Sequence, residues 1–128
     1  LDGVTLRLPA LTRAANLGRR AAKVGFDWPD AIEVLGKVRE EIEELQQAVA
    51  TGESVHVREE VGDLLFSVAQ LARHLDVDPE GALREAGGKF ERRFRRIEAS
   101  LAADGRTAAD ASMAELEALW ARAKREIG

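Results

Sequence analysis

Apolar residues recur three or four positions apart along most of this chain, and no segment alternates polar and apolar side chains. This pattern predicts amphipathic helices and excludes a fold built on a sheet. The chain has no cysteine and only 5% aromatic residues. We therefore expect a core of Ala, Leu, Val and Ile, without disulfides, thiolate metal sites or cysteine nucleophiles.

Helix start and stop signals divide the chain into five segments. The prolines stand where helices can begin, and Gly25, Gly52 and Gly105 stand where helices can end. Asp30 and Ser112 are suited to cap the helices that follow them. The predicted helices cover residues 9–24, 31–51, 54–75, 80–103 and 113–127. Long helices with short connections pack as antiparallel neighbours, so we predict an all-α bundle of about five helices.

We expect residues 1–128 to form a single domain, and to be cut from a longer protein because the only methionine is Met113. The most apolar stretch, residues 61–72, contains Asp63 and Gln70 and is too short to span a bilayer. No secretory signal segment opens the chain. A cytoplasmic location and no membrane partner are expected.

The net charge of -4 hides a strong local separation of charge. Residues 37–63 hold eight acids and three bases, whereas residues 84–96 hold six bases and two acids. Carboxylates hold Mg²⁺ and basic side chains neutralise phosphate oxygens, so this separation is typical of a metal–polyphosphate site. Solvated helix faces would give the same counts. The acidic balance disfavours nucleic-acid binding.

The positions of the acids on their helices favour the metal site. Glu41 and Glu44 lie three residues apart on one side of the apolar stripe of the second helix. Glu60 and Asp63 lie in the same relation to the stripe of the third helix. Four carboxylates that meet across two packed helices repel each other unless a cation lies among them. Periodicity alone leaves open that the two pairs face different directions.

Basic residues form a complementary row on the fourth helix, where Lys89, Arg93 and Arg96 lie along one flank. Phosphate contact and ordinary surface ion pairs with Glu85 and Glu91 are the two interpretations of this row. Trp28 likewise has two interpretations, because it is suited both to stack on a nucleobase and to close the end of a bundle.

The acidic segments have a recognisable form, Glu40-Glu41-Ile42-Glu43-Glu44 followed after fifteen residues by Glu60-Val61-Gly62-Asp63. Further motifs are Gly25-Phe26-Asp27-Trp28, the residues 62–66, the residues 89–94 and the segment from Trp120 to Lys124. This set of motifs resembles the MazG family of all-α nucleoside triphosphate pyrophosphohydrolases, and most closely the C-terminal catalytic domain of its two-domain members. The likeness extends from about Pro9 to Lys124.

The resemblance implies Mg²⁺-dependent hydrolysis of a nucleoside triphosphate to the monophosphate and pyrophosphate, in a homodimer, with Mn²⁺ able to substitute. It implies metal ligation by Glu41, Glu44, Glu60 and Asp63, with Glu40 or Glu41 in a catalytic role. It also implies that Lys89 and Arg93 contact the triphosphate and that Trp120 and Lys124 close over the nucleotide. Trp28 and His56 complete the predicted substrate-binding set.

Two positions depart from the family pattern. Gly87 stands where the family usually has Asn, and His56 stands where it often has Lys. Neither departure touches the implied metal ligands. The loss of the amide leaves one alternative function, a catalytically weakened helical dimer that binds a nucleotide or another protein.

Overall fold

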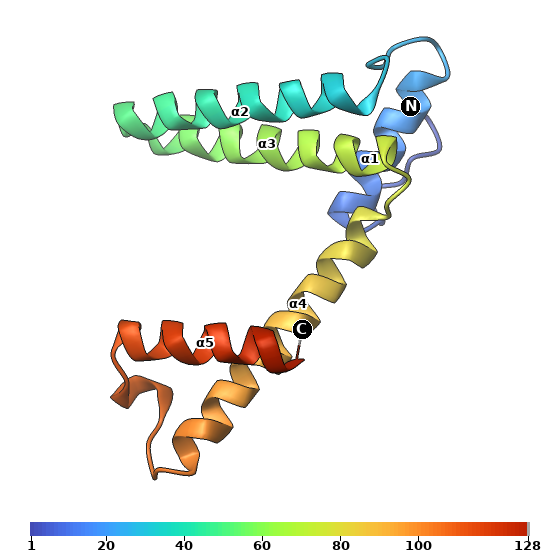
Figure 1. Ribbon diagram of the computed structural model, residues 1–128. Coiled ribbons are helices and arrows are strands. Elements are labelled where there is room, and N and C mark those ends of the chain that lie inside the picture. The colour runs from blue at the N-terminus through green and yellow to red at the C-terminus, as the bar shows by residue number, and fades with distance from the viewer. Residues whose placement is uncertain (128) are drawn as a thin grey trace. The chain divides into compact units, whose positions relative to one another are not determined.

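The computed structural model describes residues 1–127, and this part of the chain contains helices and no strand, which confirms the predicted all-α class (Figure 1). The elements are α1 (Ala10–Ala22), α2 (Ala31–Thr51), α3 (Ser54–His74), α4 (Pro79–Ala102), the short 3₁₀ helix η1 (Ala108–Asp110) and α5 (Met113–Ile127). The chain is divided into two compact units, and the boundary between them lies inside α4, between Ala82 and Leu83.

The helix ends follow the predicted cap chemistry. Asp30 accepts a hydrogen bond from the Glu33 backbone N–H at 2.9 Å, and Gly52 ends α2 in the left-handed region with φ 74°. The helix α1 ends at Ala22, two residues before the predicted end. The backbone N–H groups of Gly25 and Phe26 donate to carbonyls of the last turn of α1, so the chain leaves the helix before it reaches Gly25.

The first unit is built on an antiparallel hairpin of α2 and α3, with α1 packed against α3 (Figure 1). Its buried apolar side chains are small or β-branched, namely Ala15, Val34, Ala48 and Ala69. Small side chains bring the helix axes close together, which places polar residues on neighbouring helices within reach of each other. None of the helices in residues 1–127 combines the length and the apolar character needed to cross a membrane.

One buried polar residue fixes the approach of α1 to α3. Gln70 is 0% exposed, its Nε2 donates to the Ala14 carbonyl at 2.7 Å, and its Oε1 accepts from Arg73 Nε at 3.0 Å. A Cβ atom at position 18 would overlap Gln70 Oε1, so glycine is required there as long as Gln70 keeps this position. The amide side chain therefore packs directly against the backbone of α1.

The second unit contains α4 from Leu83 onward and α5, joined by residues 103–112. Ile97, Leu101 and Ala123 are its buried apolar residues. The connection between these helices contains the 3₁₀ helix η1. Arg106 Nη2 donates to Glu115 Oε2 at 2.7 Å, which ties the connection to α5, and Thr107 and Asp110 form a capping box at η1.

Candidate functional site

Three of the four acids that the sequence analysis selected meet between α2 and α3. Glu41 of α2 and Glu60 and Asp63 of α3 each offer a carboxylate oxygen, and these oxygens lie within 4.8 Å of one another. The i, i+3 spacing puts Glu60 and Asp63 on one face of α3, and the antiparallel hairpin brings Glu41 opposite to them. We call these three residues the acidic cluster.

The burial of Glu41 and of one oxygen of Glu60 distinguishes the acidic cluster from an ordinary charged surface, whereas Asp63 is exposed. Glu41 is only 5% exposed, and the Oε2 atoms of Glu41 and Glu60 are buried without a hydrogen-bond partner in the described chain. A buried polar atom without a hydrogen-bond partner destabilises a fold by about 1–3 kcal/mol, and by more when the group is charged. A divalent cation with oxygen ligands would remove this cost, so the donor set fits a hard cation such as Mg²⁺.

Glu44 and Glu40 lie outside the three-oxygen group. Glu44 is exposed, and its pKa is raised by the charge of Glu41, then by partial desolvation and by the charge of Glu60. Glu44 is therefore close enough to the acidic cluster for the charges of the cluster to raise its pKa. The Glu40 side chain is 66% exposed, and its Oε2 lies 3.7 Å from Lys37 Nζ.

Two nitrogen donors flank the acidic cluster. Lys37 Nζ lies 3.0 Å from Glu41 Oε1, and this hydrogen bond raises the pKa of Lys37. His56 Nε2 lies 3.2 Å from Glu60 Oε1. The contact of Lys37 with Glu41 was not predicted, although the i, i+4 spacing of the two residues was a usable signal, and His56 was predicted to contact the substrate and not Glu60.

The second unit gathers part of the predicted substrate-binding set around an aromatic group. The Arg93 guanidinium lies 5.5 Å from the Trp120 ring centre, and Phe90 lies 5.3 Å from Trp120 and 6.1 Å from Phe94. These aromatic residues line a mostly apolar pocket of about 410 Å³. Lys89 and Lys124 are exposed, whereas Arg96 of the basic row forms an ion pair with Glu126 at 2.7 Å.

Trp28 lies in a connection that is anchored to α3. The preceding residue, Asp27, accepts hydrogen bonds from Arg73 Nη1 at 3.0 Å and Nη2 at 2.7 Å, and it lies 2.9 Å from His74 Nε2. These bonds, those of Arg73 above all, hold the pKa of Asp27 well below its usual range. Asp27 is far from its partners in sequence, so no local pattern predicted this anchor.

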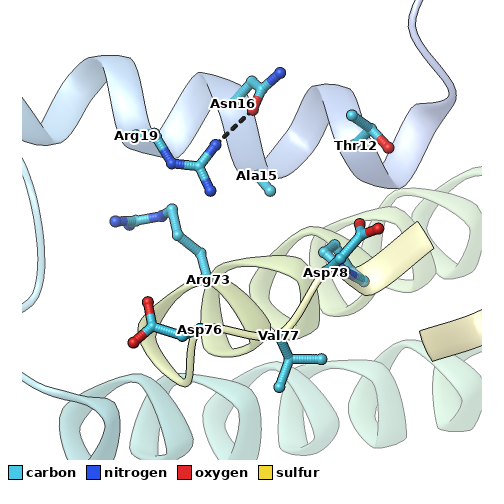
Figure 2. Close-up of a pocket in the computed structure, with 9 residues that line it drawn as sticks. Thr12, Ala15, Asn16, Arg19, Arg73, Asp76, Val77 and Asp78 are labelled. Carbon is cyan, nitrogen blue, oxygen red and sulfur yellow. Dashed lines mark hydrogen bonds between the residues drawn. The ribbon is translucent and has the colours of Figure 1, made fainter. Parts of the chain in front are cut away.

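A polar hollow of about 320 Å³ lies between α1 and the turn that joins α3 to α4 (Figure 2). Its basic side chains are engaged within the fold, because Arg19 donates to Asn16 at 2.6 Å and Arg73 binds Asp27. Asp76 and Asp78 add acidic groups to the same hollow. The acidic cluster therefore remains the better candidate for ligand binding.

The family comparison bears directly on the acidic cluster. A match to the MazG nucleotide pyrophosphohydrolase domain covers residues 15–97, which include all of its carboxylates. The chain belongs to the MazG family.

Two curated relatives align along nearly the whole chain. A nucleoside triphosphate pyrophosphohydrolase of Escherichia coli K12 is 43% identical over 130 aligned residues, which are 98% of this chain and 49% of the relative. A nucleoside triphosphate pyrophosphohydrolase/pyrophosphatase MazG of Thermotoga maritima is 42% identical over 117 residues, or 91% of this chain and 45% of the relative. The chain thus spans about half the length of these relatives.

Proposed function

We propose that this MazG domain hydrolyses nucleoside triphosphates to the monophosphate and pyrophosphate, with water attacking the α-phosphorus. The observation that carries the proposal is the acidic cluster, in which buried carboxylate oxygens converge without a partner from the described chain. The names of the E. coli and T. maritima relatives support the same reaction class. Such substrates suggest action on the cytoplasmic nucleotide pool.

We propose that Glu41, Glu60 and Asp63 hold the divalent cation, with Glu44 joining them from the next turn of α2. Oxygen donors favour Mg²⁺, with Mn²⁺ as a substitute. When bound, the cation supplies positive charge to the phosphate oxygens as the pyrophosphate leaves. Glu40 is exposed at the edge of the same helix face, and we assign it the role of accepting the proton from the attacking water.

We assign the triphosphate and the base to the remaining predicted residues. Lys89 and Arg93 neutralise phosphate charge, and Trp120 and Lys124 bind the nucleoside. The stacking of Arg93 on Trp120 supports this grouping, because one side chain orients the other. Trp28 and His56 are the residues of the first unit that we propose to contact the substrate.

The exposed apolar residues of the first unit support a homodimer. Leu35, Ile42 and Val49 of α2 recur every seven residues, and they are 39%, 44% and 61% exposed. Leu65 and Val68 of α3 are 53% and 42% exposed. A row at this spacing forms one seam of a helix, so we propose that a second copy of the chain covers it. Light scattering should then give twice the chain mass, and a monomer would contradict the dimer.

Gly87 supports the alternative of a binding module with weakened catalysis. A Cβ at this position would meet nothing within 4 Å, so packing does not require glycine here. Having glycine in place of the family's Asn then removes a polar side chain without improving the packing of α4. A domain that binds nucleotide but releases no pyrophosphate would establish this alternative.

The decisive experiment is a panel of NTPs and dNTPs assayed for pyrophosphate with Mg²⁺ and with EDTA. In H₂¹⁸O, the label should enter the monophosphate and not the pyrophosphate, because water attacks the α-phosphorus. An Asp63→Asn variant serves as the control, since it keeps the shape of the acidic cluster and removes one charge. Orthophosphate release, or label in pyrophosphate, would contradict the proposed reaction.

A further inference from the structure

The two buried free oxygens of the acidic cluster share an arrangement. In Glu41 and in Glu60, Oε2 is buried without a partner, while Oε1 lies near a nitrogen donor. The donor stands four residues earlier on the same helix in both cases, Lys37 on α2 and His56 on α3. Side chains at this spacing are neighbours on a helix face.

The chemistry fixes the direction of both hydrogen bonds. An ionised carboxylate only accepts, so the ammonium of Lys37 and the Nε2–H of His56 are the donors. Because α2 and α3 are antiparallel, residues that precede Glu41 and Glu60 lie on opposite sides of them along the hairpin (Figure 1). The two carboxylates are thus held from opposite ends.

We propose that Lys37 and His56 are positioning residues that fix these carboxylates so that each presents its Oε2 to the bound cation. This inference rests on the proposed metal site. A glutamate side chain without such a bond has more conformations available, some of which turn Oε2 away, and this freedom must be lost when a cation binds. Holding Oε1 in advance removes part of that entropy cost, as hydrogen-bond partners of metal ligands commonly do.

Replacing Lys37 by an uncharged residue has two opposite effects on metal binding. Its ammonium lies 3.0 Å from Glu41 and repels any cation nearby, so removing the charge alone would strengthen metal binding. The loss of positioning would weaken metal binding. Comparing two variants of equal charge separates these effects, because glutamine can donate a hydrogen bond to a glutamate one turn away and methionine cannot.

The measurement is the Kd of Mn²⁺, obtained from the EPR signal of the free ion without nucleotide. We expect Lys37→Met to bind Mn²⁺ about 10-fold more weakly than Lys37→Gln, within the range usual for outer partners of metal ligands. The pair His56→Met and His56→Gln should differ in the same direction. Lys37→Ala and His56→Ala are second variants without a donor, and unfolding curves in EDTA verify that each protein is folded.

Arg39 gives the matched control, since it lies on α2, is exposed and forms no ion pair within residues 1–127. Arg39→Met and Arg39→Gln should bind Mn²⁺ equally. Equal Kd values for the Met and Gln variants at both Lys37 and His56 would overturn the positioning role while leaving the metal site intact. A parent protein that binds no Mn²⁺ would instead overturn the metal site itself.

Discussion

The anchor at Asp27 makes a quantitative prediction about stability. The Asp27 side chain is 22% exposed and receives two hydrogen bonds from the guanidinium of Arg73. Hydrogen bonds to charged groups contribute about 1.5–3 kcal/mol, and the two bonds share one guanidinium. We therefore expect Asp27→Asn, which keeps the shape and removes the charge, to lower the free energy of unfolding at pH 7 by about 2 kcal/mol.

The pH dependence follows from the lowered pKa of Asp27, whose main cause is the hydrogen bonding from Arg73, with His74 adding to it against an opposing effect of burial. As the pH falls below the ordinary value of 3.8, the unfolded chain takes up the proton first. The stabilisation is therefore complete above about pH 5 and is lost as the pH falls toward the pKa of the folded state. At about 1.4 kcal/mol per pH unit, the parent and Asp27→Asn should differ by about 1 kcal/mol less at pH 3 than at pH 7.

The assay is urea unfolding followed by fluorescence. The chain has two tryptophans, so a Trp120→Phe background leaves Trp28, next to the anchor, as the only reporter. Asp2→Asn is the control, because Asp2 is exposed and its replacement should change stability by less than about 0.5 kcal/mol. A difference between parent and Asp27→Asn that is absent at pH 7, or equal at pH 3 and pH 7, would refute the reasoning.

Three further predictions concern the acidic cluster, α4 and the aromatic group. Glu44→Gln removes a charge that Glu41 repels, so the melting temperature in EDTA should stay level or rise while the shift caused by Mg²⁺ shrinks; a fall in EDTA would contradict this. Gly87→Ala should stabilise the second unit by about 0.5–1 kcal/mol in urea, as followed by Trp120, because the added Cβ meets open space. Arg93→Ala should raise KM or lower kcat for triphosphates and leave the Kd of Mn²⁺ nearly unchanged. Unchanged kinetics would show that Arg93 does not bind the substrate.

The helices were predictable because their signals are local. Asp30 and Gly52 stand at the two ends of α2, as predicted. Each makes its capping hydrogen bonds with groups no more than four residues away in the sequence. The acidic cluster was predictable for a related reason, since i, i+3 spacing fixes a helix face and a short connection fixes which helix is opposite. Glu44 shows the limit of this logic, because a pair can share a face and still differ in burial.

Contacts between distant residues could not be predicted in this way. Asp27 meets Arg73 across 46 positions, and nothing in either segment indicates the partner. Phe90 and Phe94 lie four residues apart on α4, and only the hairpin of α4 and α5 shows that Phe90 contacts Trp120. In both cases the contact depends on how the chain reverses direction, which periodicity does not encode.

The contact between Gly18 and Gln70 has a consequence for how this sequence can vary. Because a Cβ at position 18 would overlap Gln70 Oε1 and Cδ, the two positions are not independent. Gly18→Ala alone would force Gln70 out of its bonds with Ala14 and Arg73, whereas Gly18→Ala combined with a shorter residue at position 70 would relieve the overlap. The pair is therefore expected to show strong epistasis, with a double variant more stable than the sum of its single variants. Among related sequences, an alanine at position 18 should accompany a small residue at position 70.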